Sequence, residues 1–273
     1  MRTFKIFFGI SLFFLVLSGV FLGIFGLPLG VDFKGGSIFW FKGKNFSFEK
    51  IEKKFYSHFK NATLQKVSKN EILIKAKKID EKKLKDFFQK EGLFLEKKES
   101  ISPRIGKTLQ KTAIFCFLLG FILVLFYSLL SFGSFWYGLS AILALFHDVI
   151  LVLGAFSILG KIFQIELNLP FFSALLLIVG YSINDTIVIF DKFRERYKKE
   201  RDFKKAIKLA IKQSLRRSIF TSFTTLLSAG VLFFLTREVL FCFCLAIILG
   251  ILVGTYSSLT FAPFLLYLFL KNK

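Results

Sequence analysis

The most restrictive feature of this sequence is a long apolar run with an amide and a carboxylate inside it, Leu169–Glu195. The run is long enough to cross a bilayer, because a spanning helix needs about 20 mainly apolar residues. Asn184 and Asp185 nevertheless lie within it. An ionised carboxylate in a hydrocarbon span costs roughly 2.5–3.5 kcal/mol even on lenient scales, so such groups usually face a bundle interior or a wet cavity. We interpret Asp185 as a candidate for an ion or proton path. The alternative is a structural hydrogen bond to a neighbouring helix.

The composition favours an integral membrane protein. Of the 273 residues, 54% are hydrophobic and 40 are phenylalanine. A net charge of +21 would indicate nucleic-acid binding in a soluble protein, but here the basic residues gather beside apolar segments. Residues 32–111 hold 21 Lys and Arg against 10 Asp and Glu, and residues 191–217 hold 12 against 4. Since no nucleic-acid motif accompanies this charge, we expect anionic lipid headgroups or acidic partner surfaces and no nucleic acid.

Six apolar segments predict six transmembrane helices. Arg2 and Lys5 precede the first, which is longer than the core of a secretory signal and lacks an A-x-A site, so we expect an uncleaved span. The last exceeds the length that a bilayer needs, so we expect it to tilt, to bend near Pro263 or to project from the membrane. The six segments are Ile6–Leu29, Thr112–Ser131, Phe135–Gly160, Leu169–Phe190, Ser218–Leu235 and Val239–Leu270.

The distribution of positive charge predicts the orientation of these spans. A cytoplasmic N-terminus places the basic loop 191–217 and the C-terminus in the cytoplasm, in agreement with the positive-inside rule. Within that loop, apolar and lysine residues alternate over Asp202–Leu215 as in an amphipathic helix lying at the membrane interface. The predicted domains are residues 1–29 (first helix), 30–110 (extracytoplasmic) and 111–273 (five helices).

The extracytoplasmic segment predicts a small α+β domain of the ferredoxin-like type. Ser47 and Asp80 are expected to cap two helices with phenylalanine-rich inner faces. Strands are expected at Gly36–Lys42, Ala62–Val67, Glu71–Lys77 and Leu93–Lys98. The resulting order, β-α-β-β-α-β, is the ferredoxin-like one. The domain contains no paired catalytic carboxylates, no nucleophile with a base and no phosphate loop, so we expect a docking or handling domain and no enzyme.

The cysteines and histidines favour neither disulfides nor a metal centre. Cys116, Cys242 and Cys244 all lie in apolar spans, so the soluble segment has no disulfide framework and no cysteine zinc site. His58 and His147 are the two histidines, and their separation matches no metal-site spacing. No metal and no cofactor are expected.

Three consecutive spans are each predicted to carry one polar stripe. Asp148 lies beside His147 in the third span, and Asp185 shares a face of the fourth with Tyr181. Arg217 heads the stripe of the fifth span. The other members are small or carry hydroxyls: Ser140, Ala144, Thr221, Thr225 and Ser228. Packed together, the three stripes predict a buried polar seam that leads from the cytoplasmic side toward the bilayer centre.

The seam predicts proton coupling, with a structural alternative for each member. A carboxylate inside a bundle can exchange a proton as its hydration and the charges around it change, which would couple protonation to helix movement. In the alternative, Arg217 is an ordinary snorkelling cation, the hydroxyls bond their own backbone and His147 only makes a structural hydrogen bond.

Several motifs together resemble the SecF family, whose members form the smaller half of the SecDF accessory complex of the bacterial Sec translocon. The resemblance covers nearly the whole chain in order, and the block Gly-Tyr-Ser-x-Asn-Asp-Thr distinguishes SecF from SecD. The high Lys and Phe content departs from the family without touching the motifs. These are Gly30–Gly36, Ser102–Gly106, His147–Val149, Gly180–Thr186 with Phe190–Lys192, and Ser214–Ser218 with Thr221 and Ser222.

This resemblance implies an RND-like half of six spans that pairs with six from SecD in the bacterial cytoplasmic membrane, with both termini cytoplasmic. It implies an accessory subunit that uses the proton motive force to help draw preproteins through SecYEG. The family's membrane aspartate and arginine fall on Asp185 and Arg217. We group Asp148 and Asn184 with them as proton-coupling candidates, and His147 and Tyr181 as relay candidates. The implied partners are SecD, SecYEG, the translocating preprotein and anionic lipid.

Two other functions are compatible with the same pattern. One is half of an RND efflux pump, which residues 30–110 disfavour because they are too few for a substrate pocket and an exit duct. The other is a passive scaffold, in which the membrane carboxylates would be dispensable. The sequence leaves the coupling ion, H⁺ or Na⁺, open.

Overall fold

The computed structural model describes residues 2–44, 46–59, 62–77, 79–163, 165–236 and 240–271. Six of its helical segments are long and apolar enough to cross a membrane, which confirms the predicted number of spans. The chain divides into two compact units, Met1–Pro28 with Ile114–Lys273, and Leu29–Ala113. Helix α5 (Pro103–Phe132) begins in the second unit and belongs to the first from Ile114 onward. The other helices of the first unit are α1 (Arg2–Phe25), α6 (Phe135–Phe163), α7 (Leu169–Glu200), α8 (Phe203–Leu235), α9 (Phe241–Leu259) and α10 (Phe261–Leu270).

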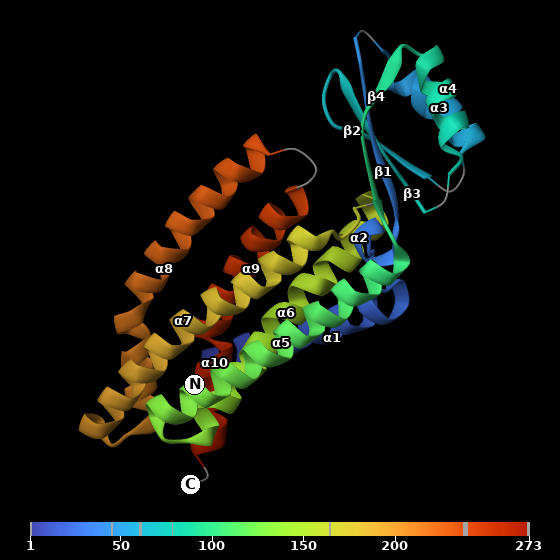
Figure 1. Ribbon diagram of the computed structural model, residues 1–273. Coiled ribbons are helices and arrows are strands. Elements are labelled where there is room, and N and C mark those ends of the chain that lie inside the picture. Colours follow the sequence, from blue (N-terminus) through green and yellow to red (C-terminus); the bar gives the residue numbers. More distant parts are fainter. Residues whose placement is uncertain are drawn as a thin grey trace. The chain divides into compact units, whose positions relative to one another are not determined.

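The centre of the helical unit is formed by α6, α7 and the α9–α10 pair. About half of their most apolar segments is buried, against 6% for α1 and α5, whose apolar side chains point outward as lipid contact requires. Helix α7 packs against α6, α8 and α9, and Figure 1 shows α8 and α6 on opposite sides of it. Because α7 carries Asp185, this packing brings the carboxylate between elements that are distant in sequence.

Two glycines of α9 allow it to approach α7 closely. A Cβ atom at Gly250 would lie 2.2 Å from the Ile178 side chain, and one at Gly254 would lie 3.1 Å from the Ser182 Cβ. Small residues at four-residue spacing permit such contacts in membrane bundles. The close contact allows Ser182 of α7 and Ser257 of α9 to donate to the same carboxylate, Asp148 of α6.

The last span is interrupted, as its length and Pro263 predict. Helix α9 ends at Leu259 and α10 begins at Phe261, so the break falls at Thr260. Proline has no N–H group for the ladder, and the first turn of a helix tolerates it. The Thr260 hydroxyl donates to the Tyr256 carbonyl oxygen across the break. The expected start of this span at Val239 lies outside the described residues.

The cytoplasmic connection predicted over 191–217 is helical apart from its turn, and not only over the expected helix at Asp202–Leu215. Helix α7 continues to Glu200 and α8 begins at Phe203, so the connection is only two residues long. Arg201 turns the chain with a left-handed φ of 53°, and the Asp202 carboxylate caps α8 by accepting from the Lys204 and Lys205 amides. Lysine and arginine are solvated equally well on a helix and on a loop, so a high density of positive charge does not show where a helix ends.

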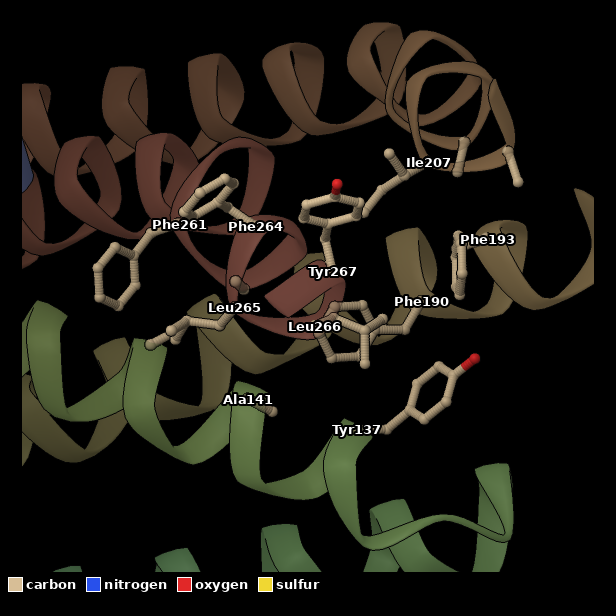
Figure 2. Close-up of a cluster of buried hydrophobic side chains, with 14 residues drawn as sticks. Tyr137, Ala141, Phe190, Phe193, Ile207, Phe261, Phe264, Leu265, Leu266 and Tyr267 are labelled. Atoms are coloured by element: carbon tan, nitrogen blue, oxygen red, sulfur yellow. The ribbon is translucent and has the colours of Figure 1, made fainter. Parts of the chain in front are cut away.

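The expected interfacial helix over 202–215 is the first part of α8, and its apolar face packs on protein. Ala206, Ile207 and Ala210 are buried in a cluster with residues of α6, α7 and α10. Figure 2 shows Ile207 near Tyr267 of α10, with Phe190 and Phe193 of α7 close by. This part of α8 is therefore fixed by the bundle, while its lysines remain exposed to solvent.

The second unit contains the predicted ferredoxin-like domain. Its elements are α2 (Val31–Lys34), β1 (Gly36–Gly43), α3 (Phe48–His58), β2 (Ala62–Lys66), β3 (Glu71–Ala76), α4 (Glu81–Lys90) and β4 (Leu93–Ile101). The antiparallel sheet has the order β2-β3-β1-β4, and α3 and α4 bury Phe55 and Phe88 against it. Asp80 caps α4 as predicted, while Ser47 occupies the N-cap of α3 without a side-chain hydrogen bond. The sequence did not predict α2.

Candidate functional site

Asp148 lies in the middle of α6 and joins three helices. Its side chain is 1% exposed. One carboxylate oxygen, Oδ2, accepts from the Ser182 hydroxyl of α7 at 2.6 Å and from the Ser257 hydroxyl of α9 at 2.8 Å. The other, Oδ1, lies 3.0 Å from Nδ1 of His147. Both oxygens are thus bonded by residues of this chain. Gly254 leaves room for the group, since a Cβ there would lie 3.6 Å from Oδ2.

His147 lies beside this carboxylate and has one nitrogen without a partner. Its ring stacks on Phe261, the first residue of α10, with centroids 4.4 Å apart and planes at 21°. The side chain is fully buried. Within the described part of the chain, Nε2 has no hydrogen-bond partner.

Asp185 lies one turn along α7 from Ser182 and faces α8. The residue is 2% exposed. The Ser218 hydroxyl forms a hydrogen bond with the carboxyl group of Asp185, and the positive charge of Arg217 interacts with this group electrostatically. Oδ2 is buried and has no hydrogen-bond partner among the described residues. The Asp185 carboxylate is therefore only partly satisfied by this chain.

A chain of hydroxyls runs beside Asp185 and links three helices. Tyr181 of α7 donates to Ser222 of α8 at 2.9 Å, and Ser222 lies 2.5 Å from the hydroxyl of Thr255 on α9. Tyr181 thus lies next to the Asp185 region, but its bond is to Ser222.

Arg217 and Asn184 lie at the surface of the helical unit. Both residues are exposed. Gly180, one turn before Asn184, is exposed too, and a Cβ there would meet no atom within 4 Å. We call Gly180, Asn184 and Arg217 the outer α7–α8 face.

Buried polar side chains do lie between the helices, but they are mostly not the members of the predicted stripes. Helix α9 contributes Ser257 and Thr255, which sequence reasoning missed, although the small residues Gly250 and Gly254 on the same helix were a signal. Most of the predicted hydroxyls satisfy backbone carbonyls of their own helix instead. These are Ser140 on Trp136, Thr221 on Arg217, Thr225 on Thr221, and Ser228 on Thr224. The hydroxyls of α8 that reach α7 are those of Ser218 and Ser222.

The described residues offer no arrangement for a metal ion. Nowhere in the described ranges do three or more His, Cys, Asp or Glu side chains come together. Among the described residues Cys116, Cys242 and Cys244 form no disulfide, and the Cys242 thiol donates to the Glu166 carbonyl oxygen. What the site does offer is two buried carboxylates, a histidine and a series of hydroxyls, which are groups that hold and transfer protons.

Comparison with known proteins places this arrangement in a family. Residues 80–272 match the family described as protein export membrane protein SecD/SecF, C-terminal. The protein translocase subunit SecF of Sebaldella termitidis is 35% identical over 289 residues, which cover 100% of this chain and 92% of that relative. The chain belongs to the SecF family. SecF of Thermodesulfovibrio yellowstonii is 38% identical over 275 residues, 93% of this chain and 90% of that protein.

The structure of this SecF-family chain agrees with solved structures of SecDF. The crystal structure of SecDF from Thermus thermophilus superposes with a TM-score of 0.87 at 32% identity, and covers 100% of this chain. SecDF in a super-membrane-facing form gives a TM-score of 0.77. The chain spans 38% of each SecDF chain. The resemblance drawn from the motifs is confirmed, and Asp148 and Asp185 both fall within the matched residues 80–272.

Proposed function

We propose that this SecF-family membrane protein is an accessory subunit of the Sec preprotein translocase, acts with a SecD partner, and uses the proton motive force to complete translocation. The observation that carries the proposal is the state of Asp185. It is buried in a span, its Oδ2 has no partner within the described residues, and the Arg217 charge acts on it. A carboxylate in this state is suited to exchange a proton.

The outer α7–α8 face supports pairing with SecD. Arg217 and Asn184 are exposed beside and within spans, where contact with lipid tails is unfavourable for a charge or an amide. A second bundle of six helices laid on this face would shield both groups and complete the surroundings of Asp185. The solved SecDF chains have the additional length for such a bundle, since this chain spans 38% of them.

The proposed mechanism couples the charge of Asp185 to the packing of α7 against α8. When ionised, the carboxylate attracts Arg217 and accepts from Ser218, which holds the two helices together. When a proton binds, the charge is lost and the attraction of Arg217 weakens, so the helices can separate and admit water from the other side. One proton taken up on one side and released on the other completes a cycle. The hydroxyl chain from Tyr181 through Ser222 to Thr255 offers a relay next to this carboxylate.

The remaining partners follow from the orientation that we propose, with both termini in the cytoplasm. The exposed lysines of α8 between Lys204 and Lys212 then lie near the cytoplasmic surface, where anionic lipid attracts them. The ferredoxin-like domain lies on the outer side, where it can contact SecYEG and the emerging preprotein. The protein acts through binding and movement and carries out no covalent chemistry.

The proposal is tested by substituting Asp185 and measuring export. Asp185→Asn keeps the size and much of the hydrogen bonding of the residue but removes its exchangeable proton. Inverted membrane vesicles carrying the variant with its SecD partner import a precursor with and without a proton gradient. We expect the stimulation by the gradient to fall about tenfold or more, since general proton-transfer groups contribute about 10²–10⁴-fold where they are used. The ATP-driven part should persist.

Two further variants define the outcome of this experiment. Arg217→Met should lose the stimulation too, because the charge that acts on Asp185 is gone. Asp191→Asn, an exposed carboxylate farther along α7, is the matched control and should behave as wild type. If Asp185→Asn retains the full stimulation, the residue is not the coupling site and the protein is a passive scaffold.

A further inference from the structure

The His147–Asp148 pair forms a site of its own, separate from Asp185. Asp148 is bonded by Ser182, Ser257 and His147, whereas Asp185 is acted on by Ser218 and Arg217. No described hydrogen bond joins the two carboxylates.

The ionisation state of Asp148 decides which nitrogen of His147 carries a hydrogen. Oδ2 of Asp148 accepts from two hydroxyls, as the oxygens of an ionised carboxylate do. An ionised carboxylate only accepts, so with Asp148 in this state Nδ1 of His147 donates to Oδ1 over 3.0 Å. In the neutral ring this leaves Nε2 as a bare acceptor, and this buried atom has no hydrogen-bond partner in the described part of the chain.

The charge balance of the pair favours one more proton. With a neutral imidazole the buried pair carries a net negative charge, which is unfavourable in a membrane bundle. A proton on Nε2 converts the pair to imidazolium and carboxylate, with no net charge and with the Nδ1 bond strengthened by the opposite charges. One proton bound at Nε2 thus removes the vacant acceptor of His147 and neutralises the net negative charge of the pair.

The surroundings contribute few competing charges. Helix α10 presents the Phe261 ring to the imidazole, and α9 presents Ser257 and Gly254. Helix α5 contacts α6 through Phe121, which packs on Leu145 and Val149, and α1 contacts it through Ser18 at Gly154. Helix α7 presents Ser182, with Tyr181 beside it in the sequence and Asp185 one turn farther. Helix α9 carries Tyr256 next to Ser257, and the Tyr256 hydroxyl donates to the Phe7 carbonyl oxygen.

We propose that His147 and Asp148 form a second proton-binding site in this subunit, in which Nε2 of His147 takes up the proton and Asp148 stays ionised as its counter-charge. In this step one proton from water binds to Nε2, and the hydrogen on Nδ1 stays in place. The assignment rests on the proposed function for its biological role, since a proton-driven subunit can use two sites. Its geometry also connects it to the break at Thr260, because Phe261 and Ser257 lie on the two sides of that break.

The chain permits a direct test, because His58 and His147 are its two histidines. His58 lies on α3 in the ferredoxin-like domain, and His58→Gln leaves His147 as the single imidazole. The full chain, with ¹⁵N-labelled histidine and in lipid nanodiscs, is studied by NMR between pH 8.5 and 5. We expect one neutral tautomer with hydrogen on Nδ1 at high pH, and a ring protonated on both nitrogens as the pH falls. A ring that stays in one neutral tautomer over the whole range overturns the proposal.

Two variants in the same background test the role of Asp148. Asp148→Asn should weaken proton binding by His147, because the variant removes the counter-charge of the imidazolium. Ser140→Ala, on the same helix but bonded to the Trp136 carbonyl, should leave it unchanged. Equal titration in wild type and Asp148→Asn overturns the assignment of the pair. If Asp148→Asn fails to fold, the titration of the His58→Gln protein decides alone. No export assay is involved, so this proposal and the proposed function can fail separately.

Discussion

The two buried carboxylates of the bundle differ in how far their own chain satisfies them. Asp148 lies in the inner contact of α6, α7 and α9, where three groups of this chain bond its two oxygens. Asp185 lies at the contact of α7 with α8, where one oxygen lacks a partner among the described residues. Their exposure is the same to within 1%. Burial therefore does not distinguish them, and the number of donors does.

This difference shows which contacts the Asp148 site and the Asp185 site each depend on. A buried carboxylate with a full set of donors stabilises the helices that supply them, and its loss leaves those donors unsatisfied. A buried carboxylate with an open position can exchange a proton or receive a group from another chain. The inner contact is thus complete within this subunit, whereas the outer one is completed by the partner that we propose.

The largest expected effect separates the two sites by stability. Asp148→Ala removes the acceptor of Ser182, Ser257 and His147 together, and we expect a loss of about 3–5 kcal/mol, as for one partner of a buried pair. Asp185→Ala should cost less than about 1 kcal/mol, because it also removes a poorly satisfied buried charge. Thermal unfolding in nanodiscs, followed by reaction of the buried Cys242 and Cys244 with a thiol dye, measures both.

The matched variant for this prediction is Asp148→Asn. It retains an acceptor for the hydroxyls and should recover part of the lost stability, although its amide has one acceptor oxygen in place of two. Equal destabilisation by Asp148→Ala and Asp185→Ala would remove the distinction between a complete and an incomplete site.

A smaller effect tests the same comparison through glycine. At Gly250, in the inner contact, a methyl group would lie 2.2 Å from Ile178, so Gly250→Ala should cost about 1–3 kcal/mol, the range for overpacking. At Gly180, on the outer face, a methyl group meets nothing within 4 Å. Gly180→Ala should therefore leave the isolated subunit as stable or more stable, since alanine favours a helix by about 0.5–1 kcal/mol.

The outer glycine gives a second measurement in the presence of the partner. If SecD covers the outer α7–α8 face, Gly180→Ala should weaken copurification of SecD while leaving the isolated subunit intact. Gly19→Ala on α1 is the control, because a Cβ there also meets open space and the residue lies on another helix. Copurification unchanged by Gly180→Ala would place the partner elsewhere.

Much of this architecture follows from the sequence, because hydrophobic length and period are local properties. The six spans and the β-α-β-β-α-β order were predictable, and so was the cap at Asp80, whose carboxylate accepts from the Lys82 and Lys83 amides. A bend near Pro263 was one of three expected ways for the long last span to fit the membrane, and the break at Thr260 agrees with it.

What could not be predicted depends on contacts between helices. Ser257 is one of many hydroxyls in apolar helices, and only the approach of α9 to α6 makes it a partner of Asp148. Thr221 and Thr225 looked equally suitable, yet they bond the backbone of α8. Ser222, which follows Thr221 by one residue, lies on a different face of α8, where its hydroxyl bonds residues of α7 and α9. A helical period reveals a polar face but does not state which neighbour it meets.

The smallest expected effect concerns a third carboxylate, Glu81, which is paired at the surface of the ferredoxin-like domain. Hydrogen bonds from Lys85 and Lys98 lower the pKa of Glu81 from 4.5 to about 2. Because the pKa is lower in the folded domain, the stabilisation is full above about pH 4.5 and is lost as the pH falls toward 2. Glu81→Gln should therefore unfold slightly more easily than wild type at neutral pH, and this difference should vanish near pH 2. In a Trp136→Phe background the fluorescence of Trp40 on β1 reports this domain alone. Water and salt screen this pair as they cannot screen Asp148, so 1 M salt should shrink the effect of Glu81→Gln and leave that of Asp148→Ala. An effect of Glu81→Gln that persists at pH 2, or that salt does not change, would mean that the ion pairs are not its source.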